Sequence, residues 1–266
     1  MPEKVLVFAP HPDDAEWYAG GTLARMAQHG DRVLIVTVTD GGCGSFEHSR
    51  EELVRLRALE AARAAQVLGA EAPILLGYPD QALDLLPPGA LREHFIRLIR
   101  QQRPDVVVAE DILAQDEVHP DHRAVARAVS EALNYATLPL VHPEHLEAGL
   151  QTHFVREKYF YGAPIEKTNK IIDVSQTMPI KLAALAEHAT QMRFLVDDVL
   201  RQAGTIPLNF SGLEALEMLP ANDPAAMVGW ALQAEAAQVG AQTGVQFAEA
   251  FRYVRFHPFI ENLISQ

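Results

Sequence analysis

Four apolar runs in the first half of the chain predict buried β-strands. They are rich in β-branched residues and lack the alternation of polar and apolar positions that is typical of a half-exposed strand. The runs cover residues 5–9, 32–39, 73–77 and 105–110. Apolar positions at helical spacing over 51–69 and 91–104 predict helices between them, the first ending at Gly69 and the second at a proline. Strands that alternate with helices of this length indicate an α/β fold with a doubly wound, mostly parallel sheet.

The second half of the chain has a less regular pattern. Residues 153–164 and 169–175 predict two further strands, and 179–204 predicts one long helix. The Ala-rich stretch 205–245 has helical character without a motif, and 246–256 predicts a closing strand or loop.

The 266-residue chain has the composition of an ordinary globular protein, with 48% hydrophobic and 21% charged residues. Without a linker or an internal repeat, we expect a single domain over 1–266. It would comprise an α/β core (1–175) and a helical C-terminal elaboration (176–266).

Charge and cysteine content narrow the classes of function. A formal net charge of −13 without a basic cluster argues against a nucleic-acid partner. No apolar run predicts a signal peptide or a membrane span. The single Cys43 excludes an internal disulfide and a paired-cysteine metal or redox site. These features predict a cytoplasmic protein that binds neither nucleic acid nor membrane.

Four loops follow the predicted strands of the core, at the edge where parallel sheets bind ligands. They contain "HPDDAE", "DGGCGSFEHSR", "GYPDQAL" and "DILAQDEVHPDH". The tripeptide His-Pro-Asp therefore occurs twice, at equivalent strand ends. Pro12 and Pro120 each suit the first position of a helix, which would place His11 and His119 at the caps.

Either His-Pro-Asp motif alone is compatible with a simple helix start. Together they bring two or three imidazoles and two or three carboxylates into one crevice, which a structural role does not explain. A His/carboxylate/His set with an open fourth position is typical of a catalytic zinc site. The same donors also accept iron, cobalt or manganese.

The chain resembles the LmbE-like/PIG-L family of zinc-dependent N-acetylglucosaminide deacetylases. The resemblance rests on "HPDDAE", "GGTLARMAQHGDRVLIVTVTDG", "AAQVLG", "LGYPD", "HPDHRAVARAV", "KLAALAEHATQ" and "AEAFR", in the expected order over most of 4–256. It implies a Rossmann-like sheet and one zinc ion held by His11, Asp14 and His122. It further implies that Asp13 is the catalytic base and that His119 stabilises or protonates the reacting centre.

The implied reaction removes an acetyl group from a small N-acetylated sugar and releases acetate and a free amine. Zinc lowers the pKa of a bound water to about 7, so that one aspartate can bind the metal while its neighbour accepts a proton. Asp121, adjacent to His119, could hold its imidazole in orientation. The resemblance also implies a homo-oligomer, a trimer or a hexamer.

Further candidate residues have structural alternatives. Arg57 and Asp80 match family positions that contact substrate, although a solvated arginine or a turn aspartate would look the same in sequence. His188 could lie near the substrate or serve local packing, and Cys43 is best explained as a small residue in a glycine loop.

Two other classes of function compete with a metal-dependent amidohydrolase. A nucleotide-cofactor enzyme would carry a glycine fingerprint after its first strand, where this chain has "HPDD". The loop after the second strand also lacks that spacing, because Glu47 stands where a glycine is needed. A non-catalytic sugar-binding module would have lost the base or a ligand. Deacylation of another small N-acyl amine stays open.

Overall fold

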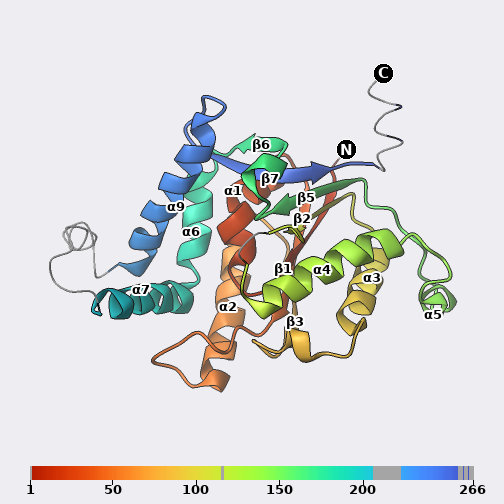
Figure 1. The fold of residues 1–266 in the computed structure, drawn as a ribbon, viewed down its shortest axis with the longest axis horizontal. Helices are drawn as coiled ribbons and strands as arrows, with labels where there is room; N and C mark the ends of the chain where they lie inside the picture. Colours follow the sequence, from red (N-terminus) through yellow and green to blue (C-terminus); the bar gives the residue numbers. More distant parts are fainter. Residues whose placement is uncertain (1, 115–116, 206–222, 257–259, 261–262, 264–266) are drawn as a thin grey trace.

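A single sheet organises the computed structural model, which describes residues 2–114, 117–205, 223–256, 260 and 263 (Figure 1). Within these residues the strand order is β3-β2-β1-β4-β5-β7-β6. The strands are β1 (Lys4–Ala9), β2 (Arg32–Thr39), β3 (Ile74–Tyr78), β4 (Val106–Glu110), β5 (Glu157–Tyr161), β6 (Lys170–Asp173) and β7 (Ala248–Val254). Neighbours among β1 to β5 are parallel, whereas β7 runs antiparallel to both β5 and β6. The sequence therefore predicted the mostly parallel α/β fold correctly.

Helices cover both faces of the sheet because its central strands are apolar on both sides. They are α1 (Asp14–Gln28), α2 (Arg50–Leu68), α3 (Ala90–Gln102), α4 (Pro120–Tyr135), α5 (Pro143–Glu147), α6 (Met178–Ala186), α7 (Ala189–Ala203) and α9 (Pro224–Ala241). Alternate residues of β1 illustrate the two layers. Leu6 and Phe8 pack with α3 and α4, whereas Val5 and Val7 pack with α1 and α2.

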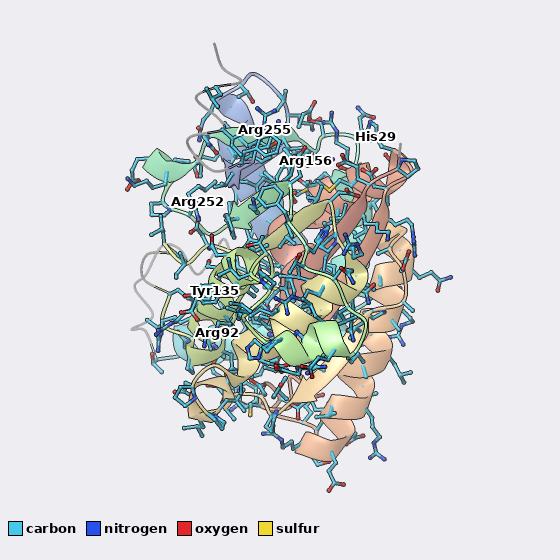
Figure 2. All side chains as sticks on the ribbon, turned by 90° about the vertical axis from the view of Figure 1, so that its right-hand side faces the viewer. His29, Arg92, Tyr135, Arg156, Arg252 and Arg255 are labelled. Carbon is cyan, nitrogen blue, oxygen red and sulfur yellow. The ribbon has the colours of Figure 1, made fainter. Side chains whose placement is uncertain are left out.

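The α3–α4 layer is joined at its surface by a ring contact. Figure 2 shows Arg92 of α3 beside Tyr135 of α4, and the guanidinium carbon lies 5.5 Å from the ring centroid. Helices α6, α7 and α9 share a third apolar cluster and lie together at the left of Figure 1. No helix in the described ranges is long and apolar enough to cross a bilayer.

The long helix predicted over 179–204 is wrong, because the chain forms α6 and α7 with a break at His188. Glu60 of α2 explains the break. Its carboxylate accepts hydrogen bonds from the backbone N–H of Thr190 at 3.0 Å and from its hydroxyl at 2.6 Å. A helix begins where its first N–H groups find such an acceptor, so α7 starts anew opposite α2.

The remaining predicted elements agree with the structure. Helix α2 ends at Gly69 in the left-handed conformation that glycine adopts easily, and β7 forms within 246–256. The predicted helical stretch 205–245 contains α9, and its residues 206–222 lie outside the described residues. Since β7 lies between β5 and β6, residues 248–254 belong to the same sheet as the N-terminal strands.

A buried ion pair fastens β7 to two helices. Glu249 of β7 lies 2.7 Å from Lys181 Nζ of α6, and both side chains are 5% exposed. The Glu249 carboxylate also accepts the backbone N–H groups of Gly21 and Thr22 in α1. One side chain thus connects β7, α1 and α6.

We predict that Glu249→Ala lowers the free energy of unfolding by about 3–5 kcal/mol, because it leaves Lys181 buried without its counter-charge. Urea unfolding followed by circular dichroism measures the change. Adding Lys181→Met should recover much of the loss. As a control, Glu71→Ala breaks the exposed pair with Arg32 and should cost below about 1 kcal/mol. Equal effects of Glu249→Ala and Glu71→Ala would contradict the prediction.

Candidate metal centre and active site

Loops from the carboxyl ends of β1 to β4 converge on one polar cluster. The loop after β1 supplies His11, Asp13 and Asp14, the turn after β3 supplies Asp80, and the start of α4 supplies His122. All five side chains are buried. The doubly wound topology thus brings together the two His-Pro-Asp motifs, as the sequence predicted.

Three ligand atoms form a nearly equilateral triangle. His11 Nδ1 lies 3.2 Å from both Asp14 Oδ2 and His122 Nε2, and these two atoms are 3.4 Å apart. Donors at about 2.0–2.1 Å from a tetrahedral zinc ion are separated by about 3.3 Å. The triangle therefore matches one face of a tetrahedral site and leaves the fourth corner open.

Carboxylates stand behind both imidazoles of the triangle. His11 Nε2 is 3.3 Å from Asp80 Oδ1 and from Asp121 Oδ2. His122 Nδ1 is 2.9 Å from Glu110 Oε2 and 3.6 Å from a carboxylate oxygen of Glu117. Metal-bound histidines are commonly oriented in this way, by a carboxylate on the ring nitrogen that faces away from the ion.

The charges around the triangle favour a cation. Burial opposes protonation of His122, yet the carboxylates of Asp14 and Glu110 raise its pKa to about 9. Burial likewise opposes ionisation of Asp14, but the charge of His122 and the hydrogen bonds from His11 lower its pKa. A divalent ion at this position would supply the positive charge, so the donor set and its surroundings both fit a metal.

The two aspartates of "HPDD" are separated by an unusual backbone conformation. Helix α1 begins at Asp14, and Asp13 is its N-cap with φ of 115°. The prediction that His11 caps this helix is therefore wrong. A positive φ is strained for aspartate and requires support from its surroundings. It turns the Asp13 carboxylate toward α2, whereas Asp14 faces the histidines.

Arg57 of α2 holds the Asp13 side chain. Arg57 Nη2 donates to Asp13 Oδ1 at 2.8 Å and to the carbonyl of Pro12, and Nη1 donates to the carbonyl of Gly41 at 3.1 Å. Burial raises the pKa of Asp13 to about 6; Arg57 opposes this rise, and the neighbouring charge of Asp14 adds to it. A carboxyl group with this pKa can exchange a proton near neutral pH.

His119 caps α4, as predicted from "HPDH". Its Nδ1 accepts the backbone N–H of Asp121 at 3.2 Å, and its Nε2 lies 2.8 Å from the side-chain amide of Gln81. Its ring centroid is 4.6 Å from that of His11 and 5.1 Å from that of His122. Burial and the two neighbouring imidazoles lower the pKa of His119. His119 therefore lies beside the triangle, and one of its ring nitrogens is within 4.8 Å of the ring nitrogens of His11 and His122.

Asp121 has a different neighbour from the one expected. Its carboxylate accepts the backbone N–H groups of Gln81 and Leu83 and faces His11. The Asp121 carboxylate and a nitrogen of the His119 ring also lie within 4.8 Å of each other, and the side-chain amide of Gln81 is 2.8 Å from His119 Nε2. Asp121 is thus placed to support His11, and its proposed role in orienting His119 stays a prediction.

The three predicted substrate contacts lie beneath or beside the cluster. Arg57 is buried against Asp13, and Asp80 faces His11 while it accepts the backbone N–H of Cys43 at 2.9 Å. His188 is fully buried, with Nε2 3.5 Å from a carboxylate oxygen of Glu16. These positions suit the support of other site residues better than direct contact with a substrate.

Glu110 and Gln81 are site residues that the sequence pattern did not reveal. Glu110 ends the apolar run of β4, and a charged residue at the carboxyl end of a buried strand is a signal that could have identified it. Gln81 has φ of 66° in the turn after β3, and no sequence pattern predicts this unusual conformation for a glutamine.

Comparisons with known proteins agree with this geometry. The profile of the PIG-L family, described as GlcNAc-PI de-N-acetylase, matches residues 6–133. The diacetylchitobiose deacetylase of Thermococcus kodakarensis is 34% identical over 191 residues, covering 71% of this chain and 70% of the relative. A probable N-acetyl-alpha-D-glucosaminyl L-malate deacetylase 2 of Bacillus anthracis is 31% identical over 204 residues. That alignment covers 74% of this chain and 85% of the relative.

A solved structure extends the similarity to the whole fold. The N,N'-diacetylchitobiose deacetylase of Pyrococcus horikoshii, in complex with its inhibitor MPG, superposes with a TM-score of 0.78 at 27% identity. The alignment covers 97% of this chain and 88% of the other. The paired His-Pro-Asp loops, the parallel sheet that joins them and these similarities establish that the chain belongs to the PIG-L (LmbE-like) family.

Proposed function

We propose that this protein is a zinc-dependent deacetylase. It would hydrolyse the N-acetyl amide of an N-acetylglucosamine-type sugar or glycoside and release acetate and a free amine. The observation that carries the proposal is the triangle of His11, Asp14 and His122 with Asp13 turned away from it. One carboxylate of the pair is placed to bind metal, and the other keeps its oxygens for proton transfer.

His11, Asp14 and His122 would hold the zinc ion, which supplies Lewis-acid chemistry when bound by polarising an amide carbonyl and acidifying water. Asp13 would accept the proton of the attacking water and then deliver it to the departing nitrogen. His119 would donate a hydrogen bond to the carbonyl oxygen as negative charge develops there. Arg57 would keep Asp13 in position through the 2.8 Å ion pair.

The relatives support an N-acetylated glucosamine as the substrate class. Their names specify diacetylchitobiose, glucosaminyl malate and a glucosaminyl inositol. In each of these substrates an acetamido group is carried by a glucosamine ring, so the reaction at the amide is the same. The homo-oligomeric state and the cytoplasmic location stay predictions from the sequence.

Replacing the proposed base should abolish turnover without loss of metal. We expect Asp13→Asn to lower kcat by about 10²–10⁴-fold, because the amide cannot accept the proton. Primary-amine release from a panel of N-acetylglucosaminides measures activity, and elemental analysis measures zinc per chain. Asp198→Asn on α7 is the isosteric control. If zinc-loaded wild type releases no amine from any sugar, the substrate class is wrong, and a non-catalytic module or another N-acyl amine becomes the better hypothesis.

The carboxylate behind His122 should tune metal affinity. We expect Glu110→Gln to weaken zinc binding by about 10–100-fold, because the amide orients the imidazole less well and carries no charge. Competition with a zinc-binding dye measures the dissociation constant. His122→Ala should weaken binding further, whereas His29→Ala, at the far end of α1, should leave it unchanged. Unaltered affinity in both Glu110→Gln and His122→Ala would refute the assigned site.

Arg57 should affect turnover more than substrate binding. We expect Arg57→Met to lower kcat about tenfold or more with little change in KM, because it releases the Asp13 carboxylate. Steady-state kinetics on the preferred glucosaminide separates the two parameters, and zinc content checks that the centre is intact. A rise in KM with unchanged kcat would instead make Arg57 a substrate contact.

A further inference from the structure

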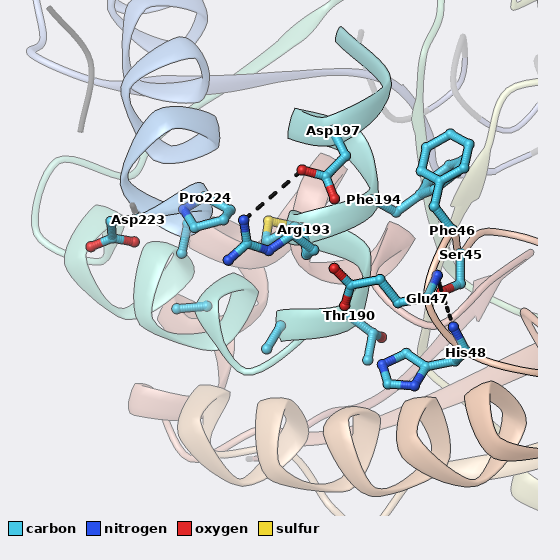
Figure 3. A pocket seen from close by; sticks show the side chains of 14 residues that line it. Ser45, Phe46, Glu47, His48, Thr190, Arg193, Phe194, Asp197, Asp223 and Pro224 are labelled. Atoms are coloured by element: carbon cyan, nitrogen blue, oxygen red, sulfur yellow. Dashed lines mark hydrogen bonds and ion pairs between the residues drawn. The ribbon is translucent and has the colours of Figure 1, made fainter. Parts of the chain in front are cut away.

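A cavity of about 540 Å³ lies between the loop that follows β2 and the helices of the C-terminal half (Figure 3). Residues 45–48 of the loop form one wall. Helix α7 forms the opposite wall, and the start of α9 closes one end. Its volume is in the range of small-molecule sites, which cover about 300–1,000 Å³. None of the residues assigned to the metal centre lines this cavity.

One wall of the cavity contacts residues of the metal centre, and the other is held by the helix that carries Arg57. The loop begins at Gly41, which accepts a hydrogen bond from Arg57, and Cys43 donates to Asp80. On the other side, α7 begins directly after His188, and Glu60 holds Thr190. Since Glu60 lies one helical turn from Arg57 on α2, the cavity adjoins the site that positions Asp13.

Two phenylalanines meet at one side of the cavity. Phe46 of the loop and Phe194 of α7 have ring centroids 5.2 Å apart, and the Arg201 guanidinium carbon lies 4.0 Å over the Phe46 ring. Phe46 nevertheless remains 46% exposed. Aromatic faces in a pocket of this kind pack against the C–H face of a ring-shaped ligand.

Three carboxylates, one arginine and one histidine, His48, are the ionisable groups of the lining. Figure 3 shows Glu47, Asp197 and Asp223 around the cavity, with Arg193 between them. Arg193 lies 3.9 Å from Asp197, so part of its charge is already compensated. The surroundings therefore repel an anionic ligand, whereas hydroxyl groups can donate to the carboxylates and accept from Arg193.

The covalent structure of a glucosaminide indicates which part of the substrate would occupy this cavity. The acetamido group is on C2, and in the substrates named for the relatives the glucosaminyl ring carries its second group on the neighbouring carbon, C1. With the amide at the metal centre, a group on C1 has to occupy an adjoining space. The relatives differ in this group, which is a second sugar in diacetylchitobiose and a dicarboxylate in glucosaminyl malate.

We infer that the cavity lined by Phe46, Phe194 and the three carboxylates binds the group on C1, and that this group is an uncharged ring such as a second sugar. This inference rests on the proposed deacetylase function and selects among its substrates. It assigns specificity to the loop after β2 and to α7, separately from the residues that perform the reaction.

The test compares kcat/KM for three N-acetylglucosaminides, with the zinc-loaded 266-residue chain. The methyl glycoside lacks a second ring, N,N'-diacetylchitobiose has a neutral one, and the malate conjugate is anionic. We expect wild type to prefer the disaccharide about tenfold or more over the other two, a factor that corresponds to one buried ring contact. A preference for the malate conjugate, or equal rates on all three, would overturn the inference.

Substitutions of Phe46 and Phe194 test whether the preference for the disaccharide depends on these two rings. Phe46→Ala and Phe194→Ala should each lower kcat/KM for the disaccharide about fivefold to tenfold and leave the methyl glycoside unchanged. Phe46→Tyr should retain activity because it keeps the ring. Phe154→Ala removes a phenylalanine of similar exposure, 47%, at the opposite edge of the sheet, and should change neither rate.

A charge reversal tests the electrostatic part. Glu47→Lys should raise kcat/KM for the malate conjugate severalfold relative to the disaccharide.

If Phe46→Ala lowers kcat/KM for the disaccharide and for the methyl glycoside in equal proportion, the ring takes no part in recognising the group on C1, and the inference is overturned. Absence of amine release from all three sugars in wild type would instead refute the deacetylase function, so the two failures are distinguishable.

Discussion

The concentration of negative charge at the carboxyl edge of the sheet is the constraint on which the rest of the site depends. Asp13, Asp14, Asp80, Glu110 and Asp121 are all buried there. Buried carboxylates are costly unless cations or hydrogen bonds compensate them. Arg57 compensates the charge of Asp13. The Asp80 carboxylate accepts one backbone N–H group and the Asp121 carboxylate accepts two, which compensates their charges only in part. The remaining charge converges on His11 and His122, which explains why a divalent cation fits between them.

The same constraint accounts for the strained start of α1. Two adjacent carboxylates in one regular helical turn would repel each other near the same ion. With φ of 115° at Asp13, they point to different partners, Arg57 on one side and the imidazoles on the other. The cost of this conformation is offset by buried contacts at both ends. The proposed assignment of Asp14 to metal binding and of Asp13 to proton transfer thus depends on one backbone dihedral angle.

The sequence predicted what depends on local pattern and on topology. Unbroken apolar runs marked the strands, and two His-Pro-Asp motifs at equivalent strand ends had to meet once the sheet was parallel. It could not predict features that depend on a partner far away in the chain. The break at His188 requires Glu60, the orientation of Asp13 requires Arg57, and Asp121 turns to His11 because Gln81 and Leu83 hold it there. None of these partners is signalled by periodicity or spacing.

The proposed reaction and the proposed choice of substrate depend on different parts of the architecture. The proposed metal ligands and base come from β-strand ends of the α/β core, whose geometry the hydrogen-bonded sheet fixes. The adjoining cavity is built from a loop and from α7 and α9, which pack through their own apolar cluster. Substitutions of the side chains with which α7 and α9 line the cavity can therefore leave the geometry of the strand ends unaltered. The relatives are named as deacetylases of glucosamines that carry different groups on C1, and a core that holds the proposed triangle apart from the adjoining cavity would allow such variation.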